Sequence, residues 1–221
     1  MSQNLWSQVD RYFADQLHPE DAALAAVLAS CEANHLPPIS VAPNQGRLLQ
    51  LLALACGARR ILEVGTLAGY STICMARALP AGGKLISLEI DPRHAGIALE
   101  NVGRAGLADK VEIRLGRALD LLPGLAGEGP FDLVFIDADK TSNPEYFAWA
   151  VKLSRPGTII VIDNVVREGK VIDAHSKDQS VQGVRRLTAA VAAEKRVRAT
   201  TLQTVGSKGY DGLIIAMVLP S

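Results

Sequence analysis

The chain has 221 residues, of which 48% are hydrophobic and 21% charged, which is enough apolar content for one filled core and argues against a disordered chain. It carries 23 Lys and Arg against 23 Asp and Glu, so it lacks the basic surplus typical of nonspecific nucleic-acid binding, although Lys195, Arg196 and Arg198 could form a local basic patch. No apolar run reaches the roughly 18 residues that span a bilayer, and the start, MSQNLWSQVDRYF, lacks the features of a signal peptide. We expect a single cytoplasmic domain, 1–221, with no membrane partner.

The first 57 residues predict helices only. PEDAALAAVLASCEAN has Pro19 in a first-turn position and acidic residues near the positive helix end, and PNQGRLLQLLALACG ends at Gly57, a typical C-terminal cap. Between them, Pro37 and Pro38 in HLPPISVA require a loop, because proline cannot continue a helix. We expect an N-terminal helical cap over 1–57.

From residue 58 onward, short apolar runs alternate with helical stretches. The runs are RILEVG, GKLISLEI, KVEIRLG, FDLVFIDA and GTIIVIDN, and before the last of them NPEYFAWAVKLS predicts a helix with Asn143 as its cap and Pro144 in its first turn. Continuous apolar runs suit parallel strands that are covered on both faces. RVRATTLQTV and GLIIAMVL, joined by GSKGYD, predict a C-terminal antiparallel hairpin. The expected fold is α/β, a Rossmann-like, doubly wound, mostly parallel sheet of seven strands over 58–221.

Neither the cysteines nor the histidines form a recognisable site. The three cysteines are odd in number, lack metal-ligand spacing and stand in apolar contexts, so we interpret them as reduced core residues: Cys31, Cys56 and Cys74. The four histidines share no spacing and receive no role: His18, His35, His94 and His175.

Four of the predicted strands end in a carboxylate: Glu63, Glu89, Asp137 and Asp163. In an open α/β sheet, ligands bind at the carboxyl ends of the strands, so these four acids should converge on one edge. One acid there is ordinary helix capping, but four repel one another unless a ligand or a cation lies among them. The pattern therefore predicts a site.

The first strand end is a glycine turn. Gly65 and Gly69 allow the backbone to approach a ligand closely, but their spacing is not the G-x-G-x-x-G of dinucleotide binding, and a plain tight turn is the alternative. Glu89 follows Gly65 by 24 residues, where an acid grips the hydroxyls of an adenosine ribose. Capping of the next helix is the rival role for Glu89, although Asp91 is better placed for it.

The second pair of strand ends offers oxygen ligands only. Asp137, Asp163 and Asn164 come without Cys or His, a set that suits Mg²⁺ first and Mn²⁺ or Ca²⁺ next, rather than zinc. The alternative is an Asx-type turn at Asp163 and helix capping by Asp137. Lys140, close behind, could act as a general base beside a cation, or could be an ordinary solvated loop lysine. Asp139 has no evident role.

Together these residues resemble a known family. ILEVGTLAGYST, LISLEIDP, FDLVFIDADK and IIVIDNV, in this order, resemble the metal-dependent class I O-methyltransferases that use S-adenosylmethionine, the group that contains the catechol and caffeoyl-CoA O-methyltransferases. The resemblance covers roughly residues 36–219 and is carried by the four motifs together rather than by any one of them.

The resemblance implies a role for each matching position. Lys140 would be the catalytic base, ISVAPNQG at 39–46 would border the site, and the protein would be a homodimer. A divalent cation would be held by Asp137, Asp163 and Asn164. S-adenosylmethionine would be contacted by Val41, Glu63, Gly65, Thr66, Ser71, Glu89, Ile90, Ala118 and Asp137.

Two segments depart from the family pattern. SKGYDG replaces a GDG-like turn, and Asp211 could take the acidic position that faces the acceptor, with Lys208 and Tyr210 nearby. The loop VVREGKVIDAHSKDQS at 165–180 is expected to lie over the metal and to help select the acceptor. Both departures bear on substrate choice.

The expected activity is metal-dependent O-methylation of a catechol-like or caffeoyl-type small molecule. The alternative with the same chemistry is methylation of a hydroxylated uridine in tRNA. A nicotinamide-dependent oxidoreductase is disfavoured because G-x-G-x-x-G is missing, and a non-catalytic binding protein because metal, base and cofactor positions all exist.

Overall fold

The computed structural model describes residues 2–17 and 21–220, so His18 and Pro19 lie outside the described residues. Three helices precede the sheet, as predicted: α1 (Gln3–Leu17), α2 (Ala22–Ala33) and α3 (Pro43–Ala55). Asp21 caps α2 by accepting hydrogen bonds from the amides of Ala23 and Leu24, and Gly57 follows α3 with a φ of +60°.

The strands form one seven-stranded sheet in the order β3-β2-β1-β4-β5-β7-β6. β1 to β5 pair in parallel, and β7 runs antiparallel to both of its neighbours, β5 and β6. The strands are β1 (Arg60–Val64), β2 (Lys84–Glu89), β3 (Val111–Leu115), β4 (Phe131–Ile136), β5 (Ser154–Asp163), β6 (Val197–Gly206) and β7 (Gly209–Val218). The predicted mostly parallel sheet with a C-terminal hairpin is confirmed.

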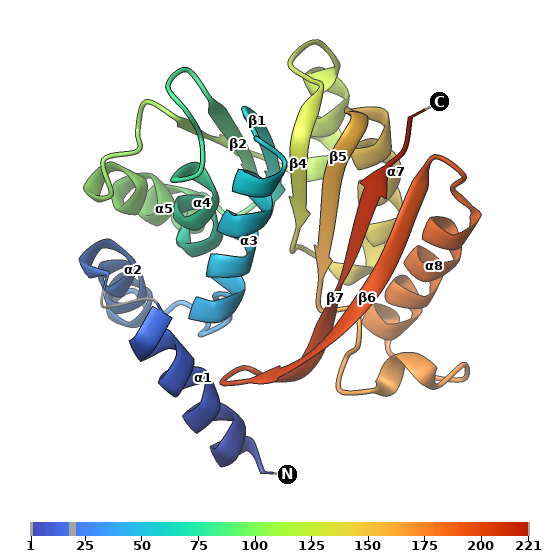
Figure 1. Ribbon diagram of the computed structural model, residues 1–221, viewed down its shortest axis with the longest axis horizontal. Coiled ribbons are helices and arrows are strands. Elements are labelled where there is room, and N and C mark those ends of the chain that lie inside the picture. Colours follow the sequence, from blue (N-terminus) through green and yellow to red (C-terminus); the bar gives the residue numbers. More distant parts are fainter. Residues whose placement is uncertain (1, 18–20, 221) are drawn as a thin grey trace.

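Helices cover both faces of the sheet (Figure 1). Side chains of α2 to α5 share one core with strand residues such as Ile61 and Leu133, and side chains of α6 to α8 share the other with Leu62 and Val134. Neighbouring strand residues thus face opposite cores, because successive side chains of a strand alternate. The remaining helices are α4 (Tyr70–Ala76), α5 (Pro92–Arg104), α6 (Ala118–Leu121), α7 (Asn143–Lys152) and α8 (Gln179–Ala193), with 3-10 helices η1 (Leu122–Gly127), η2 (Lys140–Ser142) and η3 (Lys170–Ile172). The division into a cap over 1–57 and a core over 58–221 stays a prediction, and α2 and α3 pack into the same core as the sheet.

Helix α1 lies beside the tip of the β6–β7 hairpin and projects from the rest of the chain (Figure 1). The Gln3 amide donates to the carbonyl of Gly206 at 2.7 Å, and the Asp10 carboxylate accepts from the amide of Ser207 at 2.7 Å. None of the residues of α1 is buried. Polar contacts at its first residue and at its middle therefore hold the helix, and its large apolar side chains stay exposed to solvent.

Two local predictions need correction or refinement. Asn143 is not the cap of α7: Ser142 occupies that position, and Asn143 is buried within the helix, where neither its side-chain nitrogen nor its oxygen has a hydrogen-bond partner among the described residues. Cys31 and Cys74 are buried as expected, but Cys56, at the end of α3, is only half buried. Among the residues that the structure describes, no helix is long and apolar enough to cross a membrane.

Candidate active site at the carboxyl edge of the sheet

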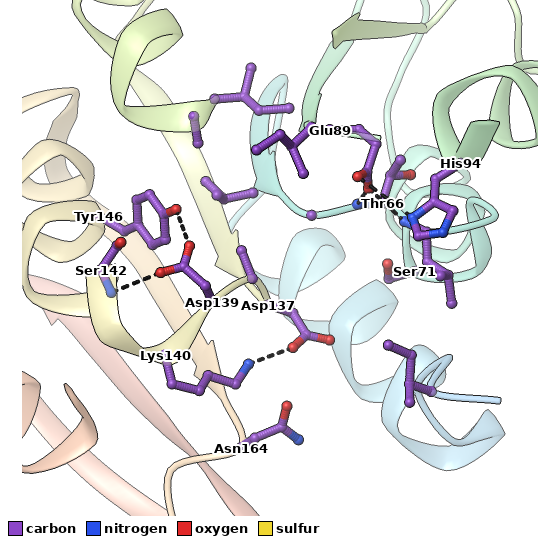
Figure 2. Close-up of a pocket in the computed structure, with 18 of the residues that line it drawn as sticks. Thr66, Ser71, Glu89, His94, Asp137, Asp139, Lys140, Ser142, Tyr146 and Asn164 are labelled. Atoms are coloured by element: carbon purple, nitrogen blue, oxygen red, sulfur yellow. Dashed lines mark hydrogen bonds and ion pairs between the residues drawn. The ribbon is translucent and has the colours of Figure 1, made fainter. Parts of the chain in front are cut away.

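A cavity of about 670 Å³ opens at the carboxyl ends of β1, β2 and β4, within the range of small-molecule sites. Figure 2 shows several of the side chains that point into it. Glu63 and Asp163, both predicted site residues, do not line the cavity and are almost completely buried behind it. The predicted residues that line it are Val41, Gly65, Thr66, Ser71, Glu89, Ile90, Ala118, Asp137, Lys140 and Asn164.

Glu63 is fully buried and accepts hydrogen bonds from three hydroxyl groups. Ser71 and Ser87 each donate from 2.6 Å, and Thr72 donates from 2.5 Å. Burial raises the pKa of Glu63 to about 7, although the three hydroxyls oppose the shift. Two hydrogen-bonded routes connect its carboxylate to the cavity wall: Ser71 directly, and Thr72 through the hydroxyl of Thr66. The structure therefore places Glu63 where it can orient Ser71.

Glu89 closes the glycine turn from the neighbouring strand. Its Oε2 accepts from the amides of Thr66 at 3.1 Å and Leu67 at 3.0 Å, and its Oε1 accepts from the amide of Asp91 at 3.0 Å. Asp91 itself caps α5, so the capping alternative for Glu89 is wrong. His94, to which no role was assigned from its sequence context, lies with its Nδ1 3.7 Å from Glu89 Oε1 and lines the cavity.

Gly65 is required by a close approach of two backbones. Its φ is +94°, and a Cβ at this position would overlap the carbonyl oxygen of Asp137. The contact joins the turn after β1 to the turn after β4, so the residues at these two strand ends are held at a fixed separation.

Lys140 and Asp137 form an ion pair inside the cavity (Figure 2). The Lys140 ammonium donates to Asp137 Oδ1 at 2.8 Å, and only 10% of the lysine side chain is exposed. Lys140 is therefore not the solvated loop lysine of the alternative interpretation. Asp137 pairs with a lysine rather than capping a helix, and the amide of Asn164 points into the same cavity (Figure 2).

Asp163 lies next to the Asp137–Lys140 pair, and its carboxylate accepts hydrogen bonds from two donors. Its Oδ1 accepts from the amide of the next residue, Asn164, at 2.7 Å, which is not the bond of an Asx turn, and its Oδ2 accepts from the side chain of Gln45. Burial and the neighbouring carboxylate of Asp137 raise the pKa of Asp163, whereas Lys140 lowers it. Two carboxylates thus share one ammonium group. Gln45 belongs to the segment 39–46 that was expected to border the site.

The predicted metal ligands suit a hard cation by their chemistry. Asp137, Asp163 and Asn164 present oxygen atoms only, and the two carboxylates are short of positive charge. Among the described residues no group of three or more His, Cys, Asp or Glu could hold a metal ion, and the predicted set contains only two such residues.

Asp139, the residue without an evident role, fixes Tyr146. Its Oδ1 accepts from the Tyr146 hydroxyl at 2.5 Å, and its Oδ2 accepts from the hydroxyl of Thr141 and the amide of Ser142 (Figure 2). Burial raises the pKa of Asp139, but these hydrogen bonds outweigh burial and hold the pKa below its usual value. Asp139 therefore caps η2 and does not orient Lys140.

A family model described as O-methyltransferase matches residues 16–218. The chain belongs to the O-methyltransferase family. This O-methyltransferase is 56% identical over 220 residues to a protein of Niastella koreensis named catechol O-methyltransferase, which covers 99% of this chain and 100% of the relative. It superposes with a TM-score of 0.96 on an O-methyltransferase of Bacillus cereus solved in complex with SAH, at 56% identity over 98% of this chain and 100% of the other. It superposes equally, at 49% identity and with all of both chains covered, on TomG of Streptomyces achromogenes, solved with SAM.

The family settles two of the sequence interpretations. The chain is an O-methyltransferase with the methyltransferase fold, as the four motifs predicted. A nicotinamide-dependent oxidoreductase and a non-catalytic binding protein do not agree with this family.

Sequence reasoning on this O-methyltransferase misassigned Asp211. Its Oδ1 accepts from the amides of Val166 and Arg167, both at 2.9 Å, so the carboxylate holds the turn after β5 rather than facing an acceptor. The cavity is lined instead by Arg167, one of the residues that the sequence did not single out, together with His94, Arg117 and Tyr146. Of these, Arg167 had a signal, because it lies in the 165–180 loop that was expected to help select the acceptor.

Proposed function

We propose that this O-methyltransferase transfers the methyl group of S-adenosylmethionine to one hydroxyl of a catechol-type small molecule, with a divalent cation, most simply Mg²⁺. The observation that carries the proposal is the pair Asp137–Lys140 beside the buried Asp163 and the cavity-lining Asn164. The catechol O-methyltransferase name of the Niastella koreensis relative supports the acceptor class.

The cofactor would lie along the first two strand ends. The neighbouring structures that hold SAM or SAH support this assignment. Glu89 has its carboxylate at the cavity wall beside Ile90, and Thr66 and Ser71 contribute polar groups from the adjoining turn and helix. Val41, in the loop before α3, and Ala118, at the start of α6, add small apolar surface. This arrangement suits a ligand with a ribose, an apolar ring and a polar tail.

A divalent cation bound by Asp137, Asp163 and Asn164 would position two adjacent hydroxyls and acidify one of them. Asp137, which pairs with Lys140 in the structure, would be one of the ligands of that cation. As a neutral amine, Lys140 would be the side chain that takes the phenolic proton at its Nζ. Its low exposure keeps bulk water away from that proton.

The test is a labelled-methyl assay with S-adenosylmethionine over three acceptors: a catechol, the matching phenol with a single hydroxyl, and bulk tRNA. We expect methylation of the catechol and none of the other two, because chelation needs two adjacent hydroxyls. Methylation of tRNA in preference to the catechol would support the nucleic-acid alternative, and equal methylation of the phenol would contradict the chelation mechanism.

We also propose that the protein is a homodimer through α1. Its large apolar residues are 45–65% exposed, a continuous surface that a second copy could cover: Leu5, Val9, Tyr12, Phe13 and Leu17. Light scattering should give twice the chain mass for the wild type and the single mass for Leu5→Gln with Phe13→Gln. A single mass for the wild type would contradict the dimer.

A further inference from the structure

Arg167 places a positive charge at the acceptor end of the cavity. It follows Asn164 by three residues in the turn after β5 and lines the same cavity as Asn164 and Lys140. About two-thirds of its side chain is buried, since 31% is exposed. A guanidinium group in this position is part of the surface that an acceptor meets.

The guanidinium group of Arg167 is only weakly matched by the protein. Its closest acid is Asp211, whose Oδ2 lies 3.7 Å from a terminal nitrogen of Arg167, too far for a hydrogen bond. The Nε of Arg167 is buried and has no hydrogen-bond partner among the described residues. The exposed part of the guanidinium group therefore has no hydrogen-bonded carboxylate partner among the described residues.

The carboxylate of Asp211 already accepts hydrogen bonds from the backbone through one of its two oxygens. Its Oδ1 already accepts from the amides of Val166, Arg167 and Gly212. Those bonds hold a turn in which Arg167 and Glu168 have φ values of +55° and +57°, a conformation that non-glycine residues rarely adopt. Asp211 therefore holds the backbone of this turn through its Oδ1, while its Oδ2 lies 3.7 Å from the guanidinium group of Arg167.

The other cavity-lining acids are already matched by donors within the protein. Glu89 accepts from three amides, Asp137 from Lys140, and Asp139 from Tyr146 and the start of η2. None of these carboxylates makes an ion pair with Arg167 in the structure. The anion that would complete Arg167 must therefore come with the ligand.

We propose that Arg167 binds a carboxylate on the acceptor, so that the preferred substrates are catechols that carry an acidic side chain, rather than neutral catechols. The inference rests on the proposed catechol O-methyltransferase function and narrows its substrate class. A planar guanidinium matches a carboxylate with two parallel hydrogen bonds, a geometry that neither an amide nor a neutral ring offers.

The test compares two acceptors of the same shape: 3-(3,4-dihydroxyphenyl)propanoate and its primary amide, in which the saturated linker keeps the catechol electronics alike. For the wild type we expect kcat/KM to favour the carboxylate by about 10- to 100-fold, the usual range for a hydrogen bond to a charged group. Arg167→Gln should bring the ratio close to one, mainly by raising KM for the carboxylate, whereas Arg167→Lys should keep part of the preference. Arg117→Gln, which removes the other cavity-lining arginine, should leave the ratio unchanged.

Calorimetry with S-adenosylhomocysteine present keeps the inference separate from the catalytic proposal. Tighter binding of the carboxylate than of the amide, lost in Arg167→Gln, supports the role of Arg167 even if neither compound is methylated, and in that case the proposed function fails alone. Equal binding and equal turnover of the two compounds by the wild type, or a preference that survives in Arg167→Gln, would overturn the role of Arg167 and leave the methyltransferase function standing. Thermal melts of both Arg167 variants establish that the turn still folds.

Discussion

The two halves of the carboxyl edge satisfy their acids in different ways. At the ends of β1 and β2, Glu63 accepts from three hydroxyls and Glu89 from three amides, all of them neutral donors fixed by the fold. At the ends of β4 and β5, Asp137 and Asp163 have one ammonium group, that of Lys140, between them.

The two halves therefore differ in whether the protein itself supplies enough hydrogen-bond donors and positive charge for the acids. At the ends of β1 and β2 each acid accepts hydrogen bonds from three neutral donors. These bonds hold the carboxylates in place, so a cofactor can bind beside them without rearrangement. Two neighbouring carboxylates with one cation are electrostatically incomplete, and a second positive charge would stabilise them. The comparison therefore assigns binding to the first half and the chemical step to the second, and each prediction below tests that assignment.

The largest effect should come from removing the single ammonium group. Lys140→Met should lower kcat by about 10²- to 10⁴-fold, the usual contribution of a general base, while the affinity for S-adenosylhomocysteine changes little. Kinetics and calorimetry measure the two quantities. Lys177→Met, at an exposed lysine of the 165–180 loop, is the matched control and should behave as the wild type. If Lys140→Met lowered both kcat and the affinity for S-adenosylhomocysteine, the assignment of binding to one half and of the chemical step to the other would be contradicted.

Removal of the divalent cation should have the next largest effect. Chelation by EDTA should abolish most of the methyl transfer, and excess Mg²⁺ should restore it, because the two carboxylates then regain a counter-charge. In Asp163→Ala with Asn164→Ala the remaining activity should no longer respond to Mg²⁺. Activity that survives EDTA unchanged would show that the metal part of the proposal is wrong.

A smaller effect should follow from Gly183→Ala on α8. A Cβ at Gly183 would overlap the carbonyl oxygen of Lys140 and lie 2.9 Å from the Cα of Thr141, so helix and turn must separate. We expect a loss of about 1–3 kcal/mol in the free energy of unfolding and a lower kcat, because Lys140 moves with its backbone. Gly96→Ala in α5, where the new Cβ meets nothing within 4 Å, is the control and should be neutral or stabilising. An unchanged kcat in Gly183→Ala would contradict the claim that the position of Lys140 depends on its contact with α8.

The smallest effect on catalysis should come from Glu63, which acts on the pH dependence of stability. Because burial raises the pKa of Glu63 from 4.5 to about 7, the folded chain holds this proton more tightly than the unfolded chain. The contribution of Glu63 to the free energy of unfolding should then fall by up to about 3 kcal/mol as the pH rises from about 4.5 to 7.

Glu63→Gln should remove that part of the slope, whereas the part due to Asp163 should persist, since the pKa of Asp163 is raised as well. Urea unfolding at several pH values measures both. An identical slope in the wild type and Glu63→Gln would contradict the assignment of the shift to Glu63.

The sequence predicted the fold well because the fold depends on local patterns. Continuous apolar runs identified the parallel strands, and the four acids at their ends located the edge at which the cavity opens. Contacts between segments that are far apart in the sequence could not be predicted from local patterns. Asp211 looked like an acceptor-facing acid, yet its partners are the amides of Val166 and Arg167, more than 40 residues earlier in the chain.

The same limit explains the site residues that were missed. His94 and Tyr146 lie on helices that have ordinary amphipathic sequences, and they become cavity residues only because α5 and α7 pack against the strand ends. Glu63 differs from these residues, because its place in the sequence is that of a ligand-binding acid. In the structure its carboxylate accepts hydrogen bonds from three hydroxyls of two other elements. Residue type and spacing indicated the chemistry, and packing decided which atoms reach the ligand.

The account is tested most directly by titrating Mn²⁺ into the protein and following free Mn²⁺ by electron paramagnetic resonance. The wild type should bind one Mn²⁺ per chain, Asp163→Asn should lose this binding, and Glu63→Gln, which removes a buried carboxylate from the other half of the edge, should retain it. Equal binding by Asp163→Asn and the wild type, or loss of binding in Glu63→Gln alone, would contradict the claim that the ends of β4 and β5 form the metal-binding half of the site.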